Sequence, residues 1–214
     1  MTDEIDLAHM RGSYQRAELH EERVCTDPIE QVRLWLDDAV HADVPEPNAM
    51  CLSTCFDGLP SSRMVLLRRL SSDGFVFFTS YFSRKGREIE RNAHAALLFY
   101  WPQLERQIRV EGHTQRIAED ESDEYFASRP RGHQLGAWAS EQSEPVENRE
   151  LLEQRMHDYE ERFEGEDVPR PHSWGGYVVI PQRVEFWQGR LNRMHDRLEF
   201  TRVNAAWSMR RLQP

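Results

Sequence analysis

The stretch from Ala49 to Ser80 reads AMCLSTCFDGLPSSRMVLLRRLSSDGFVFFTS. Its apolar segments are separated by Asp57-Gly58 and Asp73-Gly74, and Asp-Gly pairs favour tight hairpin turns. Short strands joined by such turns are typical of an antiparallel sheet that is closed or sandwiched. We therefore expect three consecutive strands, at residues 49–54, 62–70 and 74–80.

Outward from this stretch, the hydrophobic period changes between that of a strand and that of a helix. A first helix is expected from Asp27-Pro28, with Asp27 as N-cap and Pro28 at the first helical position. Its apolar face is formed by Ile29, Val32, Leu36 and Val40. Further helices are expected at 83–92, 119–128, 134–140 and 147–163. Further strands are expected at 95–101, 106–117, 176–180, 183–188, 197–202 and 206–212. This order predicts one α+β domain at residues 27–214, built on a β-barrel and preceded by an N-terminal arm at residues 1–26.

The composition is that of a soluble globular protein, with 39% hydrophobic and 30% charged residues. No apolar run approaches the roughly 20 residues that span a membrane, and the acidic N-terminus does not resemble a signal peptide. A cytoplasmic location is therefore expected. The net charge of −10 argues against a nucleic-acid partner, although a local arginine cluster can still bind a small anion.

The three cysteines predict neither a disulfide framework nor a metal site. Cys51 and Cys55 are four residues apart in an expected strand, a span of about 13 Å, which is too long for a disulfide. We expect both to be small buried residues, and we expect no bound metal.

The segment Ser83-Arg84-Lys85-Gly86 predicts a phosphate site. Among 27 basic residues, Lys85 is the single lysine. The segment opens an expected helix, where free backbone N–H groups and the helix dipole favour an anion. Two cations in the first turn oppose that dipole unless an anion binds there.

Other motifs are ambiguous when each is taken alone. Arg63 and Arg68 flank an apolar strand, which is slightly better explained by strand ends that reach solvent. Gln107, in a strand, either reads the polar edge of a ring or faces water. Tyr125 and Arg129 are four apart on one helical face and form either a phosphate cradle or an ordinary helix end, with equal weight.

A further motif, Arg193-Met194-His195-Asp196-Arg197, follows Trp187. In an extended segment, Arg193, His195 and Arg197 share one face. Two cations and an imidazole on one face indicate a ligand nearby.

Together, these motifs resemble the pyridoxamine 5'-phosphate oxidase family along essentially the whole chain. The motifs follow the order and spacing of the family, which is more specific than any one of them. The matching segments are 63–68, 78–79, 83–86, 98–101, 105–112, 128–140, 142–143, 174–177, 185–189 and 192–197.

The resemblance implies an FMN-binding split β-barrel that forms a homodimer with FMN at the subunit interface. By motif match, the residues that line FMN are Arg63, Met64, Val65, Leu66, Leu67, Arg68, Phe78, Thr79, Arg84, Lys85, Gln107, Gln142, Ser143, Trp187 and Arg197. Those that bind the substrate are Arg11, Tyr14, Arg68, Tyr125, Arg129, His133, Arg193, Met194 and His195. Arg193 and His195 are the implied catalytic residues, and Arg11 and Tyr14 belong to a lid.

The implied reaction converts pyridoxine or pyridoxamine 5'-phosphate to pyridoxal 5'-phosphate, with oxygen as acceptor and hydrogen peroxide as product. Three positions depart from the family pattern, which usually has Lys at Arg68, Ser at His133 and Leu at Met194. Two departures fall in the substrate-phosphate cradle. The alternatives are a related split-barrel flavin oxidase, such as those of phenazine biosynthesis, and a non-catalytic flavin- or pyridoxal-phosphate-binding protein.

Overall fold

The computed structural model describes residues 13–214, and the predicted lid residue Arg11 lies outside them. The α-helices are α1 (Pro28–His41), α2 (Arg84–Arg91), α3 (Glu119–Ala127), α4 (Arg131–Ala139) and α5 (Arg149–Arg162). The strands are β1 (Ala49–Phe56), β2 (Leu59–Leu66), β3 (Arg69–Ser71), β4 (Gly74–Ser80), β5 (His94–Trp101), β6 (Arg106–Arg116), β7 (Trp174–Gln188), β8 (Asp196–Val203) and β9 (Ala206–Arg211). Short 3-10 helices lie at Glu21–Arg23, Pro102–Leu104 and Leu191–Arg193. The predicted α+β class is confirmed.

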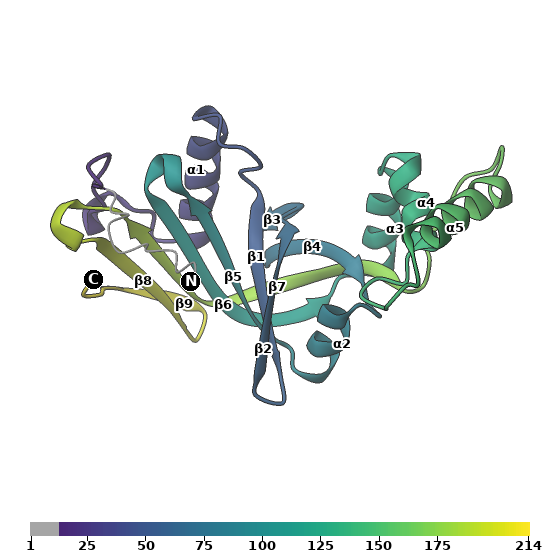
Figure 1. The fold of residues 1–214 in the computed structure, drawn as a ribbon. Coiled ribbons are helices and arrows are strands. Elements are labelled where there is room, and N and C mark those ends of the chain that lie inside the picture. Colours follow the sequence, from purple (N-terminus) through teal and green to yellow (C-terminus); the bar gives the residue numbers. More distant parts are fainter. Residues whose placement is uncertain (1–12) are drawn as a thin grey trace, which may run out of the picture. The chain divides into compact units, whose positions relative to one another are not determined.

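The strands form a sheet of order β2-β1-β5-β6-β7-β4-β3, in which β7 also pairs with β8, and β8 with β9 (Figure 1). The pairs β1–β2, β1–β5, β3–β4, β4–β7, β7–β8 and β8–β9 are antiparallel. The chain divides into two compact units. Unit one holds the described residues up to Pro47, Tyr100–Arg109 and Arg183–Pro214; unit two holds Asn48–Phe99 and Val110–Gln182.

Local chemistry explains where these elements begin and turn. Asp57 and Gly58 have φ values of 50° and 74°, the left-handed pair that a tight two-residue hairpin between β1 and β2 needs. The Asp27 carboxylate accepts a hydrogen bond from the backbone N–H of Ile29, and the Ser83 hydroxyl accepts one from that of Gly86. The predicted N-cap Asp27 is therefore confirmed, and Ser83 is an N-cap that was not predicted.

Two strand predictions were wrong at their boundaries. The predicted strand 62–70 is interrupted between β2 and β3, where the backbone N–H groups of Leu67 and Arg68 bond to Asn48 and Val76 instead. The predicted strands 176–180 and 183–188 are the single strand β7, which continues through Pro181. Gly112 of β6 permits a close approach to β7 at this point, because a Cβ there would lie 2.1 Å from the carbonyl oxygen of Ile180.

Two side-chain predictions and one backbone prediction also need correction. Cys51 and Cys55 are half-buried, since the buried face of β1 carries the alternate residues Met50, Leu52 and Thr54. Val40 is exposed, and α1 instead buries Ala39 and Trp35. The segment 191–195 is not extended, because the backbone is left-handed at Asn192 and Arg193.

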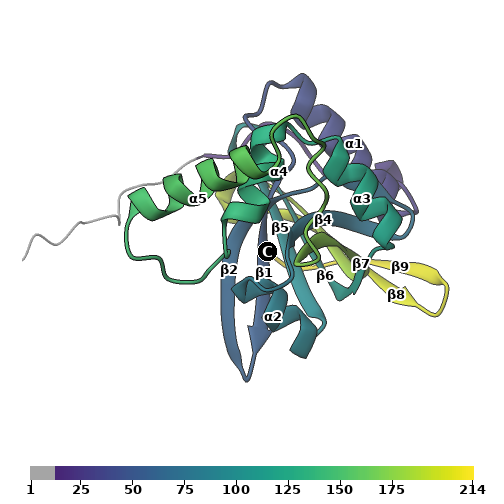
Figure 2. The same ribbon diagram turned by 90° about the vertical axis from the view of Figure 1, so that its right-hand side faces the viewer.

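Each unit has its own apolar core. In unit one, α1 packs through Trp35 against Phe186 of β7, with ring centroids 5.2 Å apart. In unit two, α3, α4 and α5 gather into one group (Figures 1 and 2), around a cluster that includes Phe126, Leu135 and Trp174. Among residues 13–214, no helix is long and apolar enough to cross a membrane.

Candidate functional site

Unit two contains a cavity of about 970 Å³. Its walls come from β2, β4, the first turn of α2, the adjoining ends of α3 and α4, and residues 142–143. The lining residues are Ser61, Ser62, Arg63, Met64, Val65, Leu66, Arg68, Phe78, Thr79, Arg84, Lys85, Tyr125, Ser128, Arg129, Pro130, His133, Gln142, Ser143 and Trp174. The cavity therefore gathers segments that are far apart in the sequence.

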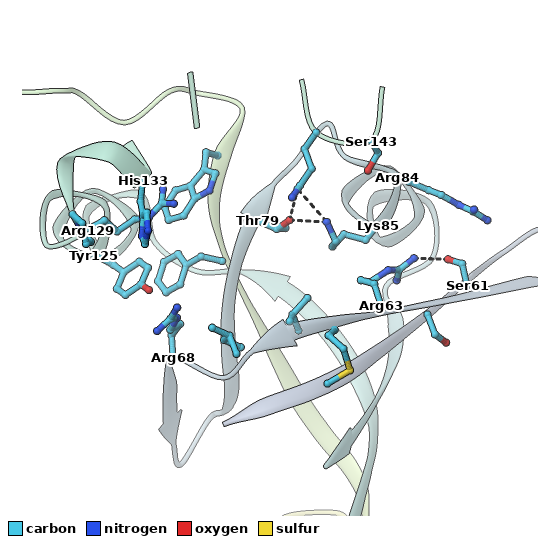
Figure 3. A pocket seen from close by; sticks show the side chains of 18 of the residues that line it. Ser61, Arg63, Arg68, Thr79, Arg84, Lys85, Tyr125, Arg129, His133 and Ser143 are labelled. Atoms are coloured by element: carbon cyan, nitrogen blue, oxygen red, sulfur yellow. Dashed lines mark hydrogen bonds between the residues drawn. The ribbon is translucent and has the colours of Figure 1, made fainter. Parts of the chain in front are cut away.

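The basic side chains of the cavity form two separate groups (Figure 3). Arg63, Arg84 and Lys85 make up the first group, and Arg68 and Arg129, beside His133, make up the second. Two cationic groups at two ends of one cavity can bind two anionic groups, carried either by one ligand or by two ligands that occupy the cavity together.

The first group is organised by Glu88, a buried residue of α2. Its Oε2 accepts hydrogen bonds from Thr54 and Ser61, each at 2.6 Å, and from Nη2 of Arg63 at 3.2 Å. Its Oε1 accepts from Nε of Arg84 at 2.9 Å. Burial on its own raises the pKa of Glu88, but these hydrogen bonds outweigh it and lower the pKa to about 2. Glu88 is therefore an ionised anchor for both arginines.

Lys85 is buried in the same group and donates to three oxygens. Its Nζ lies 3.1 Å from Thr79 Oγ1, 3.3 Å from Ser83 Oγ and 3.1 Å from Gln142 Oε1. Burial first, and then the positive charge of Arg63, lower the pKa of Lys85 to about 8. Within residues 13–214, no carboxylate forms an ion pair with the ammonium, so an anionic ligand would find a cation that is hydrogen-bonded but not neutralised.

In the second group, Arg129 lies over an aromatic platform. Its Cζ is 4.5 Å from the ring centroid of Trp174. The rings of Tyr125 and Phe78 stack on each other, with their centroids 3.9 Å apart, and both also stack with Trp174. Among residues 13–214, Nη1 of Arg129 is the only buried side-chain nitrogen or oxygen without a hydrogen-bond partner. Burial, followed by the neighbouring charge of Arg68, lowers the pKa of Arg129. A buried donor without a partner is rare and indicates a missing acceptor, here an anion.

Between the two groups, the cavity wall is apolar. Met64, Val65 and Leu66 of β2 and Phe78 of β4 line it, and Met64 is one of the most exposed apolar residues of the chain. Such a wall suits a planar aromatic ring. The donor set and the wall together fit a flavin mononucleotide: a ring against β2 and a phosphate at Arg63, Arg84 and Lys85.

A second cluster of predicted residues lies in unit one. The His195 ring packs on Trp187 with centroids 4.7 Å apart, and the Tyr14 ring meets both edge-on at 5.7 Å. Gly189 leaves room for Tyr14, since a Cβ there would lie 2.8 Å from Tyr14 Cγ. Arg197 forms a bidentate ion pair with the buried Glu185, at 2.8 and 3.0 Å.

The predicted site residues therefore fall into two sets. Most of the predicted FMN and phosphate ligands line the cavity, although Leu67 is buried and absent from its lining. Gln107, Trp187, Arg193, Met194, His195, Arg197 and Tyr14 do not line it either. Sequence reasoning missed Glu88 and the platform residue Trp174. The spacing of Arg84 and Glu88 could have revealed the first, since residues four apart meet on a helix. Among residues 13–214, no three His, Cys, Asp or Glu side chains are grouped as metal ligands.

Comparison with known proteins covers nearly the whole chain. Residues 36–163 match the family model described as pyridoxamine 5'-phosphate oxidase, and residues 174–214 match that of the pyridoxine 5'-phosphate oxidase C-terminal dimerisation region. The pyridoxine/pyridoxamine 5'-phosphate oxidase of Rubrobacter xylanophilus is 58% identical over 98% of this chain and 97% of its own. That of Thermosynechococcus vestitus is 53% identical over 97% and 99%.

Solved structures show the same fold. PhzG from Burkholderia lata, in complex with tetrahydrophenazine-1-carboxylic acid, is 32% identical with a TM-score of 0.89, covering 95% of this chain and 100% of its own. A pyridoxamine 5'-phosphate oxidase-related, FMN-binding protein from Nostoc punctiforme has a TM-score of 0.71 at 16% identity, covering 89% and 100%. The second likeness is evidence for the fold alone, and both support the predicted split barrel.

Proposed function

The chain belongs to the pyridoxamine 5'-phosphate oxidase family, and from that premise we propose how its own residues serve the activity. The enzyme uses FMN to convert pyridoxine and pyridoxamine 5'-phosphate to pyridoxal 5'-phosphate, with oxygen as acceptor. FMN supplies the hydride acceptor of this reaction, and the protein supplies binding and orientation. The proposals below concern which residues do this.

The unpartnered, buried Nη1 of Arg129 is the observation that best supports the assignment. We assign the phosphate of the substrate to Arg68, Tyr125, Arg129 and His133. The phosphate of FMN is assigned to Arg84 and Lys85, with Arg63 beside them. This division uses both cationic groups of the cavity and leaves the apolar β2 wall for the flavin ring.

Residues of unit one complete the proposal. By the family resemblance, we assign Gln107, Trp187 and Arg197 to FMN, and likewise Gln142 and Ser143. The protein acts as a homodimer, in keeping with the matched dimerisation region, so every assembled enzyme holds two copies of each residue.

Arg193 holds the substrate against the flavin, and His195 positions it, with Met194 between them. Hydride transfer requires the donor carbon close to the acceptor, so positioning is the main contribution of these side chains. By the family resemblance, Arg11 and Tyr14 are lid residues of an N-terminal arm at residues 1–26, which precedes a single domain at residues 27–214. The cytoplasmic location is also a proposal, which cell fractionation tests.

The decisive experiment mixes FMN-loaded protein with pyridoxine 5'-phosphate without oxygen and follows the visible absorbance of the flavin. Bleaching that air reverses, with pyridoxal 5'-phosphate formed, is the expected result. Unphosphorylated pyridoxine is the matched control and should reduce the flavin far more slowly. A flavin that stays oxidised with both phosphorylated vitamers would contradict the substrate assignment and point to Arg68 and His133.

A phenazine-type oxidase is the second candidate, because the structural likeness to PhzG extends over 95% of the chain. The identity is 32% there, against 58% and 53% for the two pyridoxine/pyridoxamine 5'-phosphate oxidases. The same anaerobic assay with a reduced phenazine carboxylic acid separates the two. Faster flavin reduction by that compound than by the phosphorylated vitamers would favour the second candidate.

A further inference from the structure

The loop before β8 turns the His195 side chain back onto its own backbone. The backbone N–H of Arg190 donates to Nδ1 of His195 at 3.1 Å. The loop can close this contact because Asn192 and Arg193 are both left-handed, with φ of 55° and 61°, and the N–H of Met194 bonds to Leu191 at 3.0 Å. Left-handed backbone costs energy in residues other than glycine, so surrounding contacts must hold this geometry.

Contacts on both sides of the imidazole supply that support. Trp187 packs on one side, and Tyr14 meets the ring at 70°. The Arg190 side chain is fixed by Glu18, at 2.6 Å, and lies 3.7 Å from Asp196. The ring therefore has a defined orientation, with Nδ1 toward the backbone and Nε2 as the nitrogen left for a ligand.

This orientation determines where the proton lies. An N–H donor that points at Nδ1 needs a lone pair there, and a neutral imidazole with a lone pair on Nδ1 carries its proton on Nε2. An imidazolium would place an N–H at Nδ1 against the N–H of Arg190, next to the Arg193 guanidinium. Burial, followed by the charge of Arg193, also lowers the pKa of His195. Among the described residues, the charged groups paired around the loop include Glu18 with Arg190, and Asp196 with both Arg190 and Arg211.

We propose that His195 acts as a neutral imidazole protonated at Nε2, a hydrogen-bond donor to the substrate, and that the backbone amide of Arg190 is the positioning group that fixes this tautomer. The inference rests on the proposed function for the identity of the acceptor. The phenolate oxygen next to the reacting carbon of the vitamer is the acceptor that best matches such a donor.

With this geometry, His195 cannot accept a proton from the substrate. In this tautomer Nε2 has no lone pair, and the lone pair of Nδ1 is engaged by Arg190. His195 therefore positions the substrate and does not take a proton from it. Protein groups other than this imidazole, or water, must accept any proton released from the substrate.

The direct test is ¹⁵N NMR of the FMN-loaded protein with labelled histidine, repeated without FMN. The chain has nine histidines, and the spectrum of His195→Gln identifies the missing pair of signals. We expect Nε2 protonated and Nδ1 unprotonated at pH 7.5. A proton on Nδ1, alone or in an imidazolium, overturns the proposal. Arg190→Ala is the matched control: it keeps the backbone amide, so the tautomer should persist.

Activity gives an independent readout through two substitutions. The amide nitrogen of Gln reaches the place of Nε2 and can still donate, whereas that of Asn reaches the place of Nδ1. We expect kcat of His195→Gln to be at least about tenfold higher than kcat of His195→Asn. Such a ratio corresponds to the free energy of one hydrogen bond to a charged acceptor. Equal, severe losses in two folded variants would overturn the donor role. If the wild-type protein failed to oxidise either vitamer but NMR found the Nε2 tautomer, the proposed function would fail and the tautomer would stand.

Discussion

The guanidinium of Arg129 lies over the indole ring of Trp174, with Cζ 4.5 Å from the centroid, and one of its buried nitrogens has no partner. Such a cation is held in place by the ring and is free to bind an anion. By our assignment, this arrangement lets a chain with a net charge of −10 bind a phosphorylated substrate. The nearby arginine, and not the net charge, determines whether an anion binds here, because the distant acidic groups are screened by solvent.

Arg129→Ala should raise KM for pyridoxine 5'-phosphate by about one to two orders of magnitude. Loss of a charge-assisted hydrogen bond costs about 1.5–3 kcal/mol, which corresponds to that range. Steady-state kinetics measures it, and the weak reaction of unphosphorylated pyridoxine should not change. Arg69→Ala is the matched control, since Arg69 pairs with Glu121 instead of lining the cavity. Equal loss with both substrates would contradict a phosphate role.

The affinity for FMN should fall as pH rises through about 8. By our assignment, the phosphate of FMN binds the protonated form of Lys85, and unliganded Lys85 has a pKa lowered to about 8. The Kd from flavin fluorescence should therefore rise by up to about tenfold per pH unit above that value. Riboflavin lacks the phosphate and should show no such rise, and Lys85→Arg should abolish it. A rise that persists in Lys85→Arg would assign the titration to another group.

The unliganded protein should become more stable over part of the alkaline range. The pKa of Lys85 is about 8 in the folded chain and 10.5 in the unfolded one. Between these values the unfolded state binds more protons, so this group makes stability rise with pH. Chemical unfolding of wild type and of Lys85→Met across pH 8 to 10 measures the difference, and the Lys85→Met protein should lack this contribution.

Glu88→Gln should destabilise the protein at neutral pH by about 3 kcal/mol, because it removes the buried carboxylate that neutralises the partly buried Arg63. The pKa of Glu88 is about 2 in the folded chain against 4.5 unfolded, so its stabilisation is complete above pH 4.5 and is lost as pH falls towards 2. Urea unfolding at several pH values measures both effects. Glu90→Gln, on the same helix, removes a half-exposed pair with Arg116 and should cost about 1 kcal/mol or less.

His133→Ser should preserve the affinity for the phosphorylated substrate, with KM within about threefold of wild type. Arg68, Tyr125 and Arg129 remain, and a serine hydroxyl still offers a hydrogen bond worth about 0.5–1.5 kcal/mol. Kinetics with pyridoxine 5'-phosphate measures this. A loss of tenfold or more would show that His133 is an adapted phosphate ligand of this chain.

Arg193→Ala should lower kcat by at least about 100-fold and leave FMN bound with unchanged affinity, because positioning contributes at least that much to a transfer reaction. Single-turnover flavin reduction separates the two effects. Arg202→Ala, at an exposed position near the end of β8, is the control and should be nearly neutral. An Arg193→Ala enzyme of near-normal efficiency would remove the clamping role.

Features with local causes could be predicted from the sequence. The Asp57-Gly58 turn, the Asp27 and Ser83 caps and the start of β4 depend on residues within one turn of each other. Features with distant causes could not. The close approach of β6 to β7 beside Pro181 depends on Gly112, which lies far from Pro181 in the sequence. The curled loop at His195 replaces the extended segment that its alternating cations suggested.

The sequence by itself determined the family, the order of the elements and which residue types are available for phosphate, because motif order and local propensity are written along the chain. The tertiary structure decided the rest: the division of the cations into two groups, the anchoring of Arg63 and Arg84 by Glu88, the unpartnered Nη1 of Arg129 and the orientation of His195. These depend on burial and on hydrogen bonds between atoms far apart in sequence. Desolvation and charge act through distance in space, which the spacing of residues along the chain does not specify.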